Sequence, residues 1–220
     1  MVCVSIYLLP LMRKLIVKGN ILVVSGPSGS GKSSLMHELL KQIPDIYFSI
    51  SSTTRSIREG EVDGVNYHFI SKEEFEQDMD EGFFLEWAKV HDNYYGTSLK
   101  PILKELHDGK LVVCDIDVQG HKIAREKLNK LITSVFITTP DQKSLKERLE
   151  KRGTDSSDVI KKRLLNAISE MTRMHEYDFL LINDDFGKTL TQLLSIARAS
   201  RSKISLVDSG DFLSRWANID

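Results

Sequence analysis

At positions 26–33 the chain reads Gly26-Pro27-Ser28-Gly29-Ser30-Gly31-Lys32-Ser33, which fits the pattern G-x-x-x-x-G-K-S/T. The apolar run 21–24 before it predicts a buried strand, and the amphipathic run 34–40 after it predicts a helix. A strand, a glycine-rich turn and a helix form the context in which this pattern binds phosphate. The alternative, an ordinary turn of glycine and serine, does not require this context.

The residues of this loop predict how a phosphate would be held. Its glycines allow successive backbone N–H groups to face one anion, and the following helix adds the partial positive charge of its N-terminus. Lys32 supplies a mobile cation for the outer phosphates, and the hydroxyl of Ser33 is a ligand for Mg²⁺. We therefore expect a phosphate-binding loop with an associated magnesium ion.

Composition excludes several classes of function. The 220 residues carry a net charge of −1, from 30 Lys and Arg against 31 Asp and Glu, so no overall field favours nucleic acid or an anionic membrane. Cys3 and Cys114 are the only cysteines, which argues against a disulfide framework and indicates a reducing, cytoplasmic location. No H-E-x-x-H or C-x-x-C pattern occurs, which argues against a structural zinc site.

Both ends of the chain differ from the middle. Residues 1–11 are mostly apolar but too short to span a bilayer, and they lack the features of a signal peptide. We expect residues 1–17 to be an extension that is either disordered or precedes the true start, since Met12 is a second possible start. For residues 201–220 we expect a tail, in which 212–216 form either a short docking helix or a loose segment.

The order of predicted elements indicates an α/β fold. Strands alternate with helices over residues 18–47 and 98–200, which predicts a parallel sheet with helices on both faces. Residues 48–97 instead hold several short strands and one helix, which begins with a capping box at Ser71. They predict an inserted, mainly antiparallel subdomain. One continuous strand is expected over 47–55, and one long helix from the polar break after Gly153 to Met174.

Charged residues near the predicted strand and helix ends are candidates for the chemistry. Asp115 and Asp117 end an apolar strand, where ligands of such sheets bind, and Asp115 could hold Mg²⁺ through water. Arg148 and Arg152 share one helical face, and Arg163 lies on the next helix. Such arginines suit phosphoryl transfer, with the polar break between the helices as the hinge of a lid at about 141–165. The alternatives are a helix cap for the aspartates and a solvated basic face for the arginines.

The insert has its own candidate set. Arg55 and Arg58, with the hydroxyls of Tyr67 and Tyr95, could clamp a phosphate monoester. Glu86 stands in an apolar run, and a carboxylate there can accept the N1–H and 2-amino groups of guanine, which adenine lacks. The hydroxyls of Ser51 and Thr97 could meet the same base edge. The alternatives are a solvent-facing Glu86 and core tyrosines with satisfied hydroxyls.

These segments resemble the guanylate kinase family over residues 18–200. The motifs that carry the resemblance are Ser51-Ser52-Thr53-Thr54-Arg55, Arg58, Gly60-Glu61-Val62-Asp63-Gly64, Tyr67-His68-Phe69, Phe84-Leu85-Glu86-Trp87-Ala88, Asn93-Tyr94-Tyr95-Gly96, Asp115-Ile116-Asp117-Val118-Gln119-Gly120, Arg148-Leu149, Arg152-Gly153-Thr154-Asp155, Lys162-Arg163-Leu164 and Ile182-Asn183-Asp184-Asp185. Thr97 stands where the family often has serine, and the hydroxyl is kept. Residues 1–11 and the last 20 have no counterpart in the family's shared core.

The resemblance implies a P-loop NTPase core with an NMP-binding insert at 48–97 and a helical lid. It implies Mg²⁺-dependent transfer of a phosphoryl group from ATP to GMP, with dGMP as a second acceptor, by a monomer or homodimer. It further implies that the catalytic residues are Lys32, Arg55, Arg148, Arg152 and Arg163. ATP would be bound by Gly26, Pro27, Ser28, Gly29, Ser30, Gly31, Lys32, Ser33 and Ser34. GMP would be bound by Ser51, Arg55, Arg58, Tyr67, Glu86, Tyr95, Thr97 and Asp117, and Mg²⁺ by Ser33 and, through water, Asp115.

Two other functions stay open at this point. One is a binding module, because guanylate-kinase-like domains of scaffold proteins keep the fold; such domains are expected to have lost the loop lysine or the lid arginines, which are present here. The other is a P-loop kinase for a different nucleotide or a sugar phosphate. Release of ADP with a panel of acceptors separates the three.

Overall fold

The computed structural model describes residues 18–153 and 155–217, so the expectations for residues 1–17 lie outside the described residues. Its core is a five-stranded sheet in the order β2-β7-β1-β8-β9, with every neighbouring pair parallel. The predicted α/β fold with a parallel sheet is therefore confirmed. The strands are β1 (Asn20–Ser25), β2 (Ile46–Ser49), β7 (Leu111–Asp115), β8 (Ile132–Thr138) and β9 (Phe179–Ile182).

The two faces of this sheet bury separate cores, because successive residues of a strand point to opposite faces. Leu22 and Val24 of β1 pack with helices α2 (Lys32–Gln42) and α8 (Phe186–Ser200). Ile21 and Val23 pack on the other face with α4 (Leu99–His107) and α5 (Val118–Leu128). Burial on both faces explains why the strands read as continuous apolar runs.

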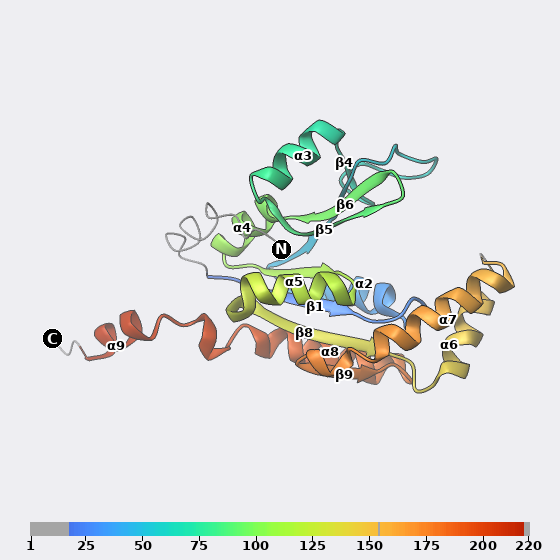
Figure 1. Cartoon of the computed structure of the whole chain (residues 1–220). Helices are drawn as coiled ribbons and strands as arrows, with labels where there is room; N and C mark the ends of the chain where they lie inside the picture. Colours follow the sequence, from blue (N-terminus) through green and yellow to red (C-terminus); the bar gives the residue numbers. More distant parts are fainter. Residues whose placement is uncertain (1–17, 154, 218–220) are drawn as a thin grey trace.

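A second sheet stands beside the core in Figure 1, in the order β4-β3-β6-β5. The pairs β3–β6 and β5–β6 are antiparallel, and β3–β4 is parallel. Helix α3 covers this sheet by stacking Phe75 on Phe84 and Tyr94. Its predicted cap is confirmed, since the hydroxyl of Ser71 accepts a 3.0 Å hydrogen bond from the backbone of Glu74. The elements are β3 (Ser52–Thr53), β4 (His68–Phe69), α3 (Lys72–Asp80), β5 (Phe84–Val90) and β6 (Asn93–Ser98).

The single strand expected over 47–55 is wrong. The chain forms two strands in two sheets: Ser49 of β2 pairs with Cys114 in the core, and Ser52 of β3 pairs with Gly96 in the second sheet. The chain therefore changes sheets at residues 50–51. As a result, the second sheet begins later than residue 48 and extends through Ser98.

Two helices form a hairpin beyond β8. They are α6 (Gln142–Arg152) and α7 (Ser157–Met171), and they enclose a small core that includes Leu145, Leu149, Ile160 and Ala167. The helix expected to reach Met174 ends at Met171, because the chain tightens into the 3₁₀ turn η2 (Met174–Glu176), where Arg173 forms a 2.7 Å ion pair with Glu176. Helix α7 thus continues past the expected lid boundary at residue 165.

The C-terminal segment leaves the core through the 3₁₀ turn η3 (Ile204–Leu206). This turn contacts η1 (Asn129–Leu131), because the hydroxyl of Ser205 donates a hydrogen bond to the carbonyl of Lys130. It then forms α9 (Ser209–Ala217), which projects from the body and buries none of its residues (Figure 1). Of the two alternatives for residues 212–216, the structure therefore has a helix, which none of its residues anchors by burial. Among the residues that the structure describes, no helix combines the length and the apolar character needed to cross a membrane.

Candidate active site

The loop between β1 and α2 has a backbone that favours glycine. Gly26, Gly29 and Gly31 have φ angles of +138°, +92° and +93°. A Cβ atom at Gly26 would collide with the carbonyl of Ile137 on β8, and one at Gly31 with the side-chain amide of Asn183. The glycines of the sequence pattern are thus required by both conformation and close packing.

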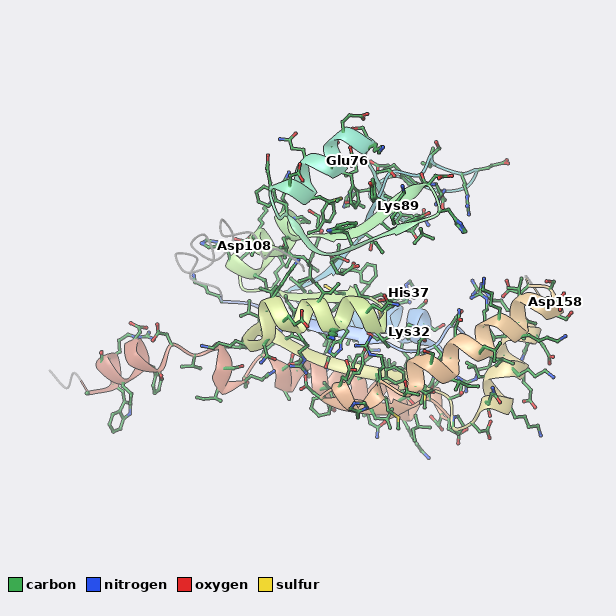
Figure 2. The ribbon with its side chains drawn as sticks, in the orientation of Figure 1. Lys32, His37, Glu76, Lys89, Asp108 and Asp158 are labelled. Carbon is green, nitrogen blue, oxygen red and sulfur yellow. The ribbon has the colours of Figure 1, made fainter. Side chains whose placement is uncertain are left out.

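This loop forms one wall of a cavity of about 640 Å³ at the carboxyl ends of β1 and β7. In Figure 2, Lys32 lies in the core, below the second sheet and its helix, which carry Lys89 and Glu76, and to the left of Asp158 on the hairpin. The lining residues come from the loop and the start of α2, from the end of β7 and the segment after it, and from α6. They are Gly26, Ser28, Gly29, Gly31, Lys32, Ser33, Ser34, Asp115, Ile116, Asp117, Arg148 and Arg152.

The electrostatics of the cavity depend on a half-buried lysine. The ammonium of Lys32 donates to the carbonyls of Gly26 and, at 3.1 Å, Pro27. Burial lowers the pKa of Lys32, and the carboxylates of Asp115 and Glu170 oppose that shift. Burial in turn raises the pKa of Asp115, and Lys32 opposes that shift. The two groups stabilise each other's charged forms in a place where either charge alone would be costly.

Asp115 and Asp117 differ more than the sequence suggests. The strand ends at Asp115, and Asp117 is the N-cap of α5: its Oδ1 accepts hydrogen bonds from the backbones of Gln119 and Gly120 at 3.0 and 2.8 Å. The expectation that both aspartates end the strand is therefore wrong, because Asp117 adopts the extended conformation of a cap. Both still line the cavity.

Three arginines of the hairpin lie around the phosphate loop. Arg148 donates to the carbonyl of Asn183 at 2.7 Å and to that of Ser30 at 3.5 Å. Arg163 donates to the hydroxyl of Ser28 at 2.5 Å and forms a 3.2 Å ion pair with Asp155. Arg152 lines the cavity and is exposed. The hairpin thus brings guanidinium groups toward the loop from two helices.

A cluster of aromatic rings surrounds Arg55 in the second sheet. Its guanidinium pairs with both carboxylate oxygens of Glu61, at 3.0 and 2.8 Å, and lies 5.7 Å from the ring centroids of Tyr67 and Phe69. Tyr67 packs edge-on against Tyr95 with centroids 5.9 Å apart. The expected residues Arg55, Tyr67 and Tyr95 therefore lie together.

Glu86 is half-buried and turned toward Thr97. Thr97, which pairs with it across the strands, is 1% exposed and donates a 2.6 Å hydrogen bond to Oε1 of Glu86. Burial raises the pKa of Glu86, and the hydrogen bond from Thr97 opposes this. Tyr95 and Thr97 are two residues apart in β6, so both side chains lie on the same face of the sheet.

Two of the expected residues are less closely joined to these groups. Arg58 is exposed, and its backbone N–H donates to Glu61 at 2.9 Å. The contact that the structure gives Ser51 is through its carbonyl, which accepts from the backbone of His68 at 2.9 Å.

Sequence reasoning assigned no role to Glu61, Asn183 or Asp155, which hold Arg55, the loop and Arg163 in place. Asn183 carried a usable signal, because it directly follows the carboxyl end of β9, where ligands and their supports gather in such sheets. Glu61 and Asp155 lie in polar loops, where charge pairing across six or eight residues has no fixed pattern.

With this geometry in place, a family model for guanylate kinase matches residues 18–200. The chain belongs to the guanylate kinase family. Members are nucleoside monophosphate kinases, transferases that pass a phosphoryl group from ATP to GMP. The resemblance seen in the sequence is thus confirmed.

Relatives in this family are similar over most of their length. The chain is 54% identical over 199 residues to a guanylate kinase of Wolinella succinogenes, and this match covers 90% of this chain and 93% of the relative. It is 54% identical over 201 residues to a guanylate kinase of Sulfurimonas denitrificans, and this match covers 91% of this chain and 98% of the relative. The crystal structure of guanylate kinase from Anaplasma phagocytophilum superposes with a TM-score of 0.70 at 30% identity, over 93% of this chain and all of that chain.

Proposed function

We propose that this chain transfers a phosphoryl group from ATP, bound at the loop between β1 and α2, to GMP or dGMP, bound against the second sheet. The observation that carries the guanine assignment is the inward-facing pair of Thr97 and Glu86, joined at 2.6 Å. Thr97 occupies one carboxylate oxygen as a donor, which leaves lone pairs of Glu86 available to the N1–H and 2-amino groups of guanine. Adenine offers neither donor and would leave the remaining lone pairs of a desolvated carboxylate without a partner.

The phosphate of GMP is placed near Arg55. Its guanidinium, fixed by Glu61, and the hydroxyls of Tyr67 and Tyr95 form a cluster suited to a phosphate monoester. Arg58, the hydroxyl of Ser51 and the carboxylate of Asp117 would supply further contacts to GMP. With its second pKa about 6, the phosphate is already largely a dianion at neutral pH and needs no strong general base.

Catalysis then depends on neutralising two polyanions and placing them in line. Lys32 meets the outer phosphates of ATP, after giving up its bonds to the loop carbonyls. Arg148, Arg152 and Arg163 approach from the hairpin, which we propose acts as a lid. Gly153, with a φ angle of +68° at the turn of the hairpin, supports a hinge there. Closure excludes water, which would otherwise hydrolyse ATP.

The residues present fit a magnesium ion bound together with ATP. The hydroxyl of Ser33 and the carboxylate of Asp115 line one cavity, and oxygen donors are what Mg²⁺ prefers. Within residues 18–153 and 155–217, no group of three or more His, Cys, Asp or Glu side chains could hold a metal ion. The ion would therefore take its other ligands from phosphate and water, with Ser33 direct and Asp115 through water. When bound, it offsets the charge of the phosphates.

The buried free Cys114 supports a reducing, cytoplasmic setting for this reaction.

The experiment that tests the proposal is ADP release with a panel of acceptors: GMP, dGMP, AMP and a sugar phosphate. We expect turnover with GMP and dGMP alone. Glu86→Gln is expected to raise the KM for GMP by more than tenfold while leaving the KM for ATP within about twofold. Glu73→Gln, an exposed change on α3, is the matched control. Equal use of AMP, or an equal loss for ATP and GMP in Glu86→Gln, would contradict the assignment.

A further inference from the structure

Helix α5 of the core forms the wall opposite the pair of Glu86 and Thr97. Gly120 of α5 lies so close to Glu86 that a Cβ atom there would stand 3.0 Å from Cγ and 3.4 Å from Oε2 of the glutamate. Both distances are at or below ordinary van der Waals contact. The missing side chain at Gly120 is therefore what allows the carboxylate to lie against the helix.

Lys127 lies two turns further along the same helix, on the same face as Gly120. Its ammonium is half-buried and donates to two neighbouring carbonyls of β5, those of Phe84 at 2.8 Å and Leu85 at 2.9 Å. Burial lowers the pKa of Lys127, and the carboxylate of Glu86 opposes that shift. A half-buried ammonium with two acceptors on one short segment is a fixed contact, unlike an exposed and mobile lysine.

The two carbonyls mark an irregularity in the strand. Phe84 pairs with Ser98 and Glu86 pairs with Thr97, so Leu85 has no residue opposite it in the β5–β6 ladder. Such a bulge re-aims the side chain that follows it and leaves backbone groups outside the ladder. Lys127 supplies a donor at this point, directly before Glu86.

The charges around Glu86 also link this carboxylate to Lys127. Its pKa is raised by burial and by Asp117, and lowered by the hydrogen bond from Thr97 and by Lys127. The other titratable group that faces it is the thiol of Cys114, whose pKa burial raises to about 12, so that it stays neutral. Lys127 is thus a cation that, together with the hydrogen bond from Thr97, favours the ionised form of Glu86.

We propose that Lys127 is a positioning residue for guanine recognition, which acts by fixing the β5 bulge so that Glu86 lies ionised against Gly120 and faces the base. This inference rests on the proposed role of Glu86 as the group that binds the guanine edge. It adds that the core, through α5, sets the specificity of a pocket built on the second sheet.

The test compares Lys127→Met with Lys122→Met, an exposed lysine of the same helix. In Lys127→Met we expect the KM for GMP to rise about tenfold, while kcat and the KM for ATP stay within about twofold. The preference for GMP over IMP, which lacks the 2-amino group, should fall, because a displaced carboxylate no longer accepts both donors. Lys122→Met should match the unchanged enzyme.

The pH dependence of kcat/KM for GMP provides a second readout, which a mere loss of packing around Glu86 would not change. Without the Lys127 charge, the acid limb of kcat/KM for GMP should shift to higher pH, while the titration of the GMP phosphate is common to both enzymes. If Lys127→Met does not fold, Lys127→Gln, which keeps a donor but removes the charge, should show the same shift.

The two proposals fail in different ways. If Glu86→Gln loses GMP selectively but the Lys127 variants keep the original KM for GMP, GMP/IMP preference and acid limb, Lys127 has no positioning role. If Glu86→Gln affects ATP and GMP equally, the guanine assignment itself is wrong. An equal rise of both KM values in Lys127→Met would also overturn the inference.

Discussion

The side-chain amide of Asn183 donates a 2.7 Å hydrogen bond to the backbone carbonyl of Ser30 and so ties the end of β9 to the phosphate loop. The carbonyl of Asn183 accepts from Arg148, so the same residue also contacts the hairpin. Its side chain is the group that a Cβ atom at Gly31 would meet, and the residue is only 4% exposed. Strand, loop and hairpin therefore meet at one buried asparagine.

We predict that Asn183→Ala loosens the phosphate loop. The carbonyl of Ser30 loses its closest donor, which should lower the free energy of unfolding by about 1–2 kcal/mol and raise the KM for ATP more than that for GMP. Urea denaturation and steady-state kinetics measure the two effects. Asn129→Ala, at an exposed position, is the control. Unchanged stability and an unchanged KM for ATP would show that this bond contributes nothing.

Lys32→Met should abolish turnover and spare GMP binding. The half-buried ammonium donates to two carbonyls of the loop, and losing such a group from a phosphoryl-transfer site is expected to cost at least about 100-fold in kcat. Calorimetry should give a dissociation constant for GMP within about twofold of the original value. Normal turnover in this variant would refute the assignment of the ATP site.

Asp115→Asn should raise the Mg²⁺ concentration needed for half-maximal activity by about tenfold, since a ligand that holds the ion through water tunes its affinity by such amounts. The measurement is a Mg²⁺ titration of ADP release at constant ionic strength and saturating nucleotides. Asp108→Asn, on the exposed end of α4, is the control (Figure 2). An unchanged requirement for Mg²⁺ would remove Asp115 from the metal site.

Stability should fall as the solution becomes acidic because of His121. This side chain is 1% exposed, stacks on Tyr177 at 3.9 Å, and has no hydrogen-bond partner for either ring nitrogen among the described residues. Burial lowers its pKa to about 4, Arg125 and Arg173 add to the shift, and Glu176 and Asp178 oppose it.

Between the unfolded pKa of about 6.5 and the folded value, the unfolded chain binds a proton that the folded chain does not. The unfolding free energy should therefore decrease from pH 6.5 to pH 4, by about 3 kcal/mol at most. His121→Phe keeps the aromatic stack and should flatten this dependence, whereas His37→Gln, at an exposed position, should not. The same slope in His121→Phe as in the unchanged chain would show that other groups cause it.

Much of the core could be predicted from the sequence because its signals are local. The strand, glycine turn and helix around Lys32, the cap at Ser71 and the alternating βα order each depend on neighbouring residues, and the structure forms them as expected. The switch between sheets after Ser49 could not be seen, because both strands lie in one run of aromatic, β-branched and hydroxyl residues that is typical of a strand. What separates them is their partners, Cys114 and Gly96, which are distant in sequence.

The site shows the same division. The inward orientation of Glu86 depends on a bulge at Leu85 and on the bare surface of Gly120, neither of which has a sequence signature. The supports of the arginines, such as Glu61, likewise depend on loop conformations. The types of the site residues and their chemistry could therefore be predicted from the sequence. The contacts that fix the positions of these residues could be seen only in the structure.

The most direct test is a crystal structure with GMP and a non-hydrolysable ATP analogue. We predict that the N1–H and 2-amino groups of guanine donate to Glu86, with the hydroxyl of Thr97 still bound to the same carboxylate and the triphosphate on the loop of Lys32. A guanine ring bound elsewhere, with Glu86 facing bulk solvent, would contradict this account.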